Sequence, residues 1–258
     1  MINKIENLVI IGAGNVASHL SRALIKKIEI KGIISKNKVS AIKLSTELNC
    51  PFIEDLSSLL VCDLVLICSN DDSISEIESQ IPPHLKVAYT SGSVELNSIL
   101  NRKNYGVFYP LQTFSKNSEL DTSSIPFFIE ATNIEFGQQL FELGTTISSQ
   151  VSYASSIERK KLHISAIFVN NFTNHLAYLA KEYSDKNNLN WQHLIPLIKE
   201  TTNKIIEASP ENSQTGPARR NDQSIIEEHL SMLDGDSKKI YQLLSESIVN
   251  TYSKKIKS

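Results

Sequence analysis

Three small residues near the N-terminus, Gly12, Gly14 and Ala17, have the spacing of a turn that binds a dinucleotide. They follow the apolar run at 8–11 and precede an amphipathic segment. In such a turn the first glycine permits a tight bend, the second lets the backbone approach a pyrophosphate, and a small third residue lets helix and strand pack closely. The alternative is a glycine-rich turn that only packs. The predicted cofactor contacts in this turn are Gly12, Gly14, Asn15 and Val16.

The residues after the second predicted strand, at 31–34, distinguish between two cofactors. An NAD site usually has Asp or Glu there to bind the ribose hydroxyls. This chain has Ser35, Lys36 and Asn37 instead, with no carboxylate. A hydroxyl followed by a cation suits a 2′-phosphate, so Ser35 and Lys36 favour NADP(H). The alternative is that Lys36 is an ordinary solvated charge.

Polar side chains also follow three further predicted strands, at 63–68, 86–89 and 105–109. Ligands of an open α/β sheet bind beyond the carboxyl ends of its strands. We therefore expect contacts with the ribose and nicotinamide side of the cofactor, and a substrate contact after the last of these strands. A helix N-cap is a second interpretation of the residues at 69–72, and cap and contact can coexist. The predicted cofactor contacts are Ser69, Asn70 and Ser91, and the predicted substrate contact is Gln112.

The apolar pattern divides the chain into two halves. Up to about residue 150, short Val/Ile/Leu runs alternate with amphipathic segments, which is typical of strands and helices around one parallel sheet. Beyond that point the pattern becomes helical, with helices expected at 155–185, 192–208, 224–233 and 237–254. We predict a Rossmann-like, mostly parallel α/β domain at 1–152, followed by an all-α domain at 153–258.

One face of the predicted helix at 155–185 carries directional hydrogen-bonding groups. Lys160, His163, Asn170 and Asn174 follow one another at steps of three, seven and four, so they form one stripe. A solvated face is usually dominated by Glu and Lys, whereas His and Asn suit a cleft or a buried network. The alternative is a hydrogen-bonded structural face at a domain or subunit interface.

Composition limits the remaining function classes. The 258 residues include 26 basic and 28 acidic side chains, so the net charge of -2 gives no general case for nucleic acid or an anionic membrane. Three cysteines without CxxC spacing argue against a disulfide framework and a zinc site, and no metal is predicted. No run approaches the ~20 apolar residues of a membrane span, so we expect a cytoplasmic protein.

Three separated motifs resemble a bacterial family in which a Rossmann-like NADP-oxidoreductase domain precedes a C-terminal helical domain of unknown function. The motifs are ERKKLHISAIFVNNFTNHL at 158–176, YPLQTFSK at 109–116, and QTGPARRND at 214–222 followed by IIEEHL. The family is similar in plan to pyrroline-5-carboxylate reductases and β-hydroxyacid dehydrogenases, whose helical domain serves dimerisation and closes the active site. The resemblance implies hydride transfer to a C=O or C=N group and a homodimer through the helical domain.

The resemblance leaves the proton donor open. β-Hydroxyacid dehydrogenases have a lysine and an asparagine one turn apart on the first long helix of the second domain. Here no asparagine lies three or four residues beyond Lys160, and His163 is near that place instead. His163 or Lys160 is the expected proton donor, with Asn170 and Asn174 orienting it.

The loop at 214–222 is the expected binding site for a substrate carboxylate. A guanidinium group can bind a carboxylate through two hydrogen bonds, so Arg219 or Arg220 would pair with this anion. An ion pair with Asp222 or Glu227 is the alternative. The predicted substrate contacts in the helical half are Asn174, Thr215, Arg219 and Arg220. The sequence thus favours an NADPH-dependent reductase of a small carboxylate-bearing substrate; the alternative is an NADP(H)-binding protein without redox catalysis.

Overall fold

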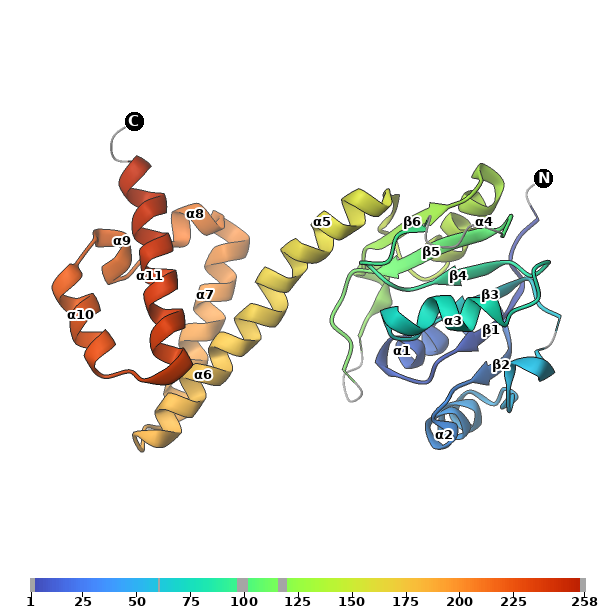
Figure 1. Ribbon diagram of the computed structural model, residues 1–258, viewed down its shortest axis with the longest axis horizontal. Coiled ribbons are helices and arrows are strands. Elements are labelled where there is room, and N and C mark those ends of the chain that lie inside the picture. Colours follow the sequence, from blue (N-terminus) through green and yellow to red (C-terminus); the bar gives the residue numbers. More distant parts are fainter. Residues whose placement is uncertain (1–2, 60, 97–101, 116–119, 256–258) are drawn as a thin grey trace. The chain divides into compact units, whose positions relative to one another are not determined.

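The computed structural model describes residues 3–59, 61–96, 102–115 and 120–255 (Figure 1). Lys116 of the motif at 109–116 therefore lies outside the described residues. The chain forms two compact units, Met1–Asn171 and Phe172–Ser258. The fold class expected from the sequence is confirmed: a mostly parallel sheet with helices is followed by an all-helical region.

The first unit is built on a seven-stranded sheet with the order β2-β1-β3-β4-β5-β6-β7. All neighbouring strands are parallel except β5 and β6. Strand β2 lies on one side of β1, and β3 lies on the other side. The strand order therefore reverses between β1 and β3. In such sheets ligands bind in the crevice at the carboxyl ends of these two strands. The strands are β1 (Asn7–Ile11), β2 (Glu29–Ile34), β3 (Leu64–Ile67), β4 (Val87–Tyr89), β5 (Tyr105–Pro110), β6 (Phe127–Ala131) and β7 (Val151–Tyr153).

Alternate residues of each strand pack against opposite layers of helices. Leu8 and Ile10 of β1 belong to one core cluster, which also contains buried residues of α1 (Asn15–Leu24), α2 (Lys38–Leu48) and α4 (Ile134–Thr145). Val9 and Ile11 belong to the second cluster, with buried residues of α3 (Ile74–Ser79). This period of two along continuous apolar runs is what a sheet covered on both faces requires.

The last helix of the first unit, α5 (Ser156–Ile167), begins at a capping box. The Ser155 side chain accepts from the Glu158 amide, and Glu158 accepts from the Ser155 amide at 2.8 Å. Five residues in π-helical conformation, Phe168–Phe172, follow before α6 (Thr173–Lys186). The helical span expected at 155–185 is therefore interrupted by a π segment. The domain boundary at 152 stays a prediction.

The second unit consists of helices. Those expected at 192–208, 224–233 and 237–254 are present with small shifts at their ends. Two short helices, Pro210–Ser213 and Pro217–Arg220, were not predicted, and the second lies within the loop expected at 214–222. The helices are α6, the 3-10 turn η6 (Trp191–Leu194), α7 (Ile195–Ala208), α8 (Pro210–Ser213), α9 (Pro217–Arg220), α10 (Gln223–Ser231) and α11 (Gly235–Lys255).

The β1–α1 turn allows a direct test of why glycine occupies its first position. Gly12 has φ +125°, and a Cβ atom there would lie 2.1 Å from the Cys68 carbonyl oxygen. We expect Gly12→Ala to lower the free energy of unfolding by at least about 2 kcal/mol. At Gly14 φ is -81° and a Cβ would meet no atom within 4 Å, so Gly14→Ala should cost less than about 1 kcal/mol. Urea denaturation followed by circular dichroism compares them; equal losses would contradict this account.

Candidate functional site

A cavity of about 790 Å³ lies at the carboxyl ends of the central strands of the first unit. The turn after β1, the ends of β3, β4 and β5, and one side of α5 all contribute to its wall. Its volume falls within the usual range for small-molecule and cofactor sites. Its lining includes Gly14, Asn15, Val16, Ser69, Asn70, Thr90, Tyr109, Gln112, Thr113, Phe114, His163 and Asn170.

The β1–α1 turn at one end of the cavity suits an anion. Gly12 donates its amide to the Ile34 carbonyl of β2 at 2.7 Å, which fixes the turn against the sheet. Gly14 caps α1 without a side-chain hydrogen bond, and the first turn of α1 contains no acidic residue. The first amides of this helix thus remain available to an acceptor, and the helix dipole favours a negative charge there.

The segment after β5 is tied to the first turns of α1. The Asn15 side-chain amide donates to the Phe114 carbonyl at 2.8 Å, and the ring of His19 contacts the Ser115 carbonyl at 2.9 Å and the ring of Phe114. His19 was not among the predicted site residues, because nothing in its sequence neighbourhood distinguishes it from a core residue of α1. These contacts fix one wall of the cavity beside the glycine turn.

Tyr109 and His163 form a hydrogen-bonded pair in the cavity wall. The Tyr109 hydroxyl lies 3.2 Å from Nδ1 of His163, and the tyrosine is buried. Gly92 leaves room for the ring, since a Cβ atom at that position would lie 2.5 Å from Cζ of Tyr109. Burial raises the pKa of Tyr109, so its hydroxyl stays protonated at neutral pH. The pair therefore combines a phenol that holds its proton with an imidazole that can exchange one.

Arg159 fixes α5 to the sheet one turn before His163. Its side chain is fully buried and forms an ion pair with Glu130 of β6, with 2.7 Å between Nη2 and Oε2. The guanidinium also donates to the carbonyls of Ser91 and Val94, each at 3.0 Å. Glu130 in turn accepts from the amide and hydroxyl of Ser156. This network joins β6, the segment after β4 and the first turn of α5, and we did not predict it.

The cavity brings together most of the predicted cofactor contacts and part of the predicted catalytic set. Five predicted residues of the first unit lie outside this lining: Gly12, Ser35, Lys36, Ser91 and Lys160. Ser91 is buried, and its hydroxyl accepts from the amides of Ser93 and Val94, so it shapes the segment after β4. Lys160 forms an exposed ion pair with Glu95 at 2.6 Å. Gly12 lies behind the turn, against Cys68.

Ser35 and Lys36 follow β2 directly beside the glycine turn, because Gly12 is hydrogen bonded to Ile34. The Lys36 side chain is 79% exposed, and its Nζ lies 3.6 Å from Oε2 of Glu76. The Ser35 hydroxyl accepts from the Asn37 amide at 3.2 Å. The Lys36 ammonium group is solvated and has one carboxylate, that of Glu76, nearby. A phosphate could therefore reach Lys36 and would compete with Glu76 for the ammonium group.

The remaining predicted residues belong to the second unit. Asn174 lies on α6, whereas Thr215, Arg219 and Arg220 border a separate cavity of about 560 Å³. The guanidinium carbon of Arg219 lies 4.3 Å from the centre of the Tyr252 ring, a cation–π contact. An ion pair of Arg219 or Arg220 with Asp222 or Glu227 was the alternative to a substrate contact. No such ion pair is present in the described part of the chain.

Fold and cavity together are those of a Rossmann-like protein with a helical C-terminal region. Residues 125–248 match the family model described as a domain of unknown function, DUF2520. A provisionally assigned NADP oxidoreductase from Bacteroides fragilis is 37% identical, with 97% of this chain and 100% of that chain covered and a TM-score of 0.89. The chain belongs to the same family as that protein, the Rossmann-like proteins with a DUF2520 region, and the resemblance noted from the sequence is confirmed.

More distant structures share the fold. Protein TM1727 from Thermotoga maritima is 20% identical, with a TM-score of 0.70 and coverage of 96% of this chain and 97% of that one. An imine reductase from Myxococcus stipitatus, solved in complex with NADP+, is 11% identical, with a TM-score of 0.66 and coverage of 97% and 94%. No curated protein matches the sequence. None of the helices in the described ranges has the length and apolar character needed to cross a membrane.

The Arg159 network predicts unequal effects for two adjacent ion pairs. Removing one partner of a buried pair costs roughly 3–5 kcal/mol, whereas an exposed pair contributes less than about 1 kcal/mol. We expect Arg159→Met to destabilise the protein by about 3 kcal/mol, and Lys160→Met, which removes the exposed pair with Glu95, by less than about 1 kcal/mol. Glu130→Gln added to Arg159→Met should recover part of the loss. Urea denaturation measures all three; similar losses for Arg159→Met and Lys160→Met would refute the assignment.

Proposed function

We propose that this protein is an NADPH-dependent reductase that transfers a hydride to a C=O or C=N group of a small, carboxylate-bearing substrate. One observation carries the proposal: a single cavity in the first unit joins the anion-binding glycine turn to the Tyr109–His163 pair. A protein that only binds the cofactor requires the turn but has no need of a proton-exchanging pair in the same cavity. The 37% identical relative, provisionally assigned as an NADP oxidoreductase, supports the same cofactor.

The residues around the turn would hold NADP(H) in two places. The amides at Gly14, Asn15 and Val16 are available to the pyrophosphate. Ser35 and Lys36 would hold the 2′-phosphate, because a hydroxyl and a cation follow β2 where a carboxylate would repel it. Ser69 and Asn70 line the cavity farther along the sheet edge, on the side expected to hold the ribose and nicotinamide. When bound, NADPH supplies the hydride.

The chain's own contribution to the reaction is a proton. Reduction of a carbonyl or imine places negative charge or a basic lone pair on the O or N atom, and a donor in the cavity must neutralise it. His163 in its imidazolium form is our proposed donor: it would give up the Nε2 proton, while its Nδ1–H is held by the Tyr109 hydroxyl oxygen, which fixes the ring. Asn170 lines the same cavity and would orient the substrate or the ring. Lys160 is the weaker candidate, since its ammonium group pairs with Glu95.

The contacts predicted for the substrate remain proposals. Gln112 lines the cavity of the first unit. Arg219 and Arg220, which border the smaller cavity of the second unit with Thr215, are the proposed partners of a substrate carboxylate. Both arginines lack an ion pair in the described part of the chain, and a guanidinium fork suits a carboxylate. The role of Asn174 and a cytoplasmic location also stay predictions.

Cofactor selectivity depends on the balance between Lys36 and Glu76. Lys36→Ala should weaken NADPH binding about tenfold and leave NADH binding unchanged, because it removes one charge-assisted contact to the 2′-phosphate. Glu76→Gln should tighten NADPH binding about threefold, since it removes the competing carboxylate. Lys38→Ala, which removes the pair with Glu54, is the matched control. Fluorescence titration with both cofactors measures the dissociation constants. NADPH affinity that is the same in Lys36→Ala and Lys38→Ala would exclude the assignment.

The proton-donor assignment predicts a specific kinetic pattern. His163→Ala should lower kcat by roughly 10²- to 10⁴-fold with NADPH affinity unchanged, and Tyr109→Phe should lower it less, because the ring loses only its orienting hydroxyl. Lys160→Met should keep most of the activity. NADPH oxidation would be followed with 2-oxo acids, 3-oxo acids and cyclic imino acids as substrates. If the protein binds NADPH but reduces none of them, a cofactor-binding role without redox catalysis replaces the proposal.

A further inference from the structure

The helix that carries His163 changes its geometry just beyond this residue. The segment Phe168–Phe172 is π-helical, so its hydrogen bonds join residues five apart instead of four. At the α-helical 3.6 residues per turn, Asn174 would lie about 20° and Asn171 about 80° from His163 around the axis. The wider turn changes this order: Asn171 lines the cavity of the first unit, whereas Asn174 is not among the described residues that line it. The π segment thus brings to the cavity an asparagine that α-helical spacing does not indicate.

The cavity wall at Asn171 consists of hydrogen-bonding groups without charge. Asn170 and Asn171 line it as neighbours in the chain. Within the described chain, neither of their side-chain amides has a hydrogen-bond partner. Among the described residues of the same lining, none is Asp, Glu, Lys or Arg. An asparagine amide has two N–H donors and one carbonyl acceptor, so this part of the wall is complementary to an uncharged group that also has both.

The nicotinamide ring of the proposed cofactor carries such a group. Its carboxamide has N–H donors and a carbonyl acceptor, so it can form two hydrogen bonds with one asparagine side chain. A rise of 1.5 Å per residue separates His163 from Asn171 by about 12 Å along the helix. That spacing leaves room for a C=O or C=N group beside the imidazole and for the nicotinamide ring beyond it.

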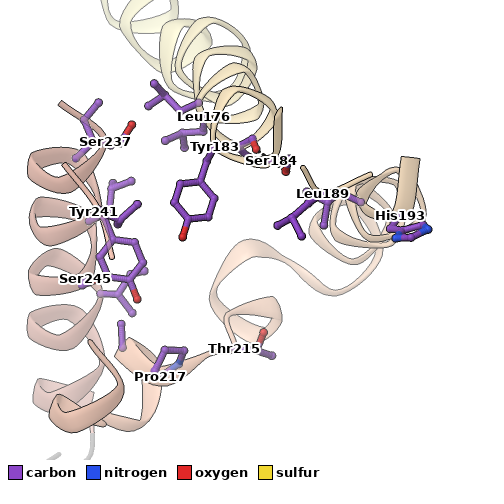
Figure 2. Close-up of a pocket in the computed structure, with 18 of the residues that line it drawn as sticks. Leu176, Tyr183, Ser184, Leu189, His193, Thr215, Pro217, Ser237, Tyr241 and Ser245 are labelled. Atoms are coloured by element: carbon purple, nitrogen blue, oxygen red, sulfur yellow. Dashed lines mark hydrogen bonds between the residues drawn. The ribbon is translucent and has the colours of Figure 1, made fainter. Parts of the chain in front are cut away.

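The larger cavity of the second unit differs in chemistry. Its volume is about 940 Å³, and its wall is mainly apolar. Figure 2 shows Tyr183 and Tyr241 facing this space from opposite sides, with Leu189 and Pro217 at its other edges. The glycine turn, which suits the pyrophosphate, lines the cavity of the first unit instead. The nicotinamide therefore belongs with the first unit, and the homodimer expected from the resemblance stays a prediction.

We propose that Asn171 binds the carboxamide of the nicotinamide ring. The contact would fix the rotation of the ring about its bond to the ribose, so that one face of the ring is presented to the substrate. Asn171 then belongs to the cofactor site, whereas Asn170 keeps the role of orienting the substrate or the imidazole. This inference rests on the proposed function, because it requires NADP(H) as the cofactor.

Two ligands that differ in the nicotinamide test the contact. NADPH carries the ring, whereas 2′-phospho-ADP-ribose has the same 2′-phosphate and pyrophosphate without it. We expect Asn171→Ala to weaken NADPH binding about tenfold and to leave 2′-phospho-ADP-ribose binding unchanged, because only hydrogen bonds to the ring are lost. Asn203→Ala, at an exposed asparagine of α7, is the matched control and should change neither. Isothermal titration calorimetry on the full chain measures the dissociation constants.

Each other result of this titration overturns the inference in a different way. Equal losses for the two ligands would show that Asn171 acts through the fold. Unchanged NADPH affinity in Asn171→Ala would show that the residue does not contact the ring. If the unaltered chain binds neither ligand, the proposed cofactor is wrong, and the inference fails with it.

A charge at position 171 gives a readout that a structural role would not change. The oxidised nicotinamide ring is a cation, whereas the reduced ring is neutral. Asn171→Asp would place a carboxylate beside the ring, so the affinity for NADP+ relative to NADPH should rise about tenfold. Asn203→Asp should leave this ratio unchanged. The same ratio in Asn171→Asp as in the unaltered chain would contradict the assignment.

Discussion

The buried guanidinium of Arg159 is the contact on which the geometry of the first unit depends. It joins three segments that are distant in the sequence: β6 through Glu130, the segment after β4 through the carbonyls of Ser91 and Val94, and the start of α5. A guanidinium has five donors in a fixed plane, so it can satisfy a carboxylate and two carbonyls together. Desolvating the two charges is costly, and the added hydrogen bonds from Ser156 to Glu130 offset part of that cost. The position of α5 is set by this arrangement more than by apolar packing, since Arg159 is its one buried residue.

The same anchor positions His163 at the edge of the sheet. It lies one turn after Arg159, so the helix that the guanidinium fixes also delivers the imidazole to the Tyr109 hydroxyl. The segment after β4 that Arg159 holds contains Gly92, whose missing side chain makes room for the tyrosine ring. A single buried ion pair thereby positions the Tyr109–His163 pair in the same cavity as the glycine turn after β1. The distance between these two functions is fixed by the sheet, because β1 and β5 belong to the same layer.

The sequence predicted those features that arise from short-range patterns. The glycine turn, the apolar strands and the helical periods depend on residues within one or two turns of each other, and the structure contains them. Arg159 paired with Glu130 and Tyr109 paired with His163 are separated by 29 and 54 residues, and no local spacing indicates such partners. Short β7 was missed because two of its three side chains are exposed, which removes the apolar run that marked the other strands. Ser91 was predicted from its place after a strand, whereas its hydroxyl accepts from nearby amides.

In the second unit the sequence predicted the helices but not what lies against their apolar faces. Apolar periodicity correctly indicated helices at 192–208 and 237–254, but periodicity reports only that a face avoids water. In the first unit the apolar faces of α1 and α4 meet the sheet, whereas in the second unit α7 retains four exposed aliphatic side chains. Covering four such side chains contributes several kcal/mol, at about 1.5–3 kcal/mol for a fully buried Leu or Ile. This is comparable to the whole stability of a small domain. The apolar pattern of α7 therefore marks a face that the described part of this chain leaves largely uncovered.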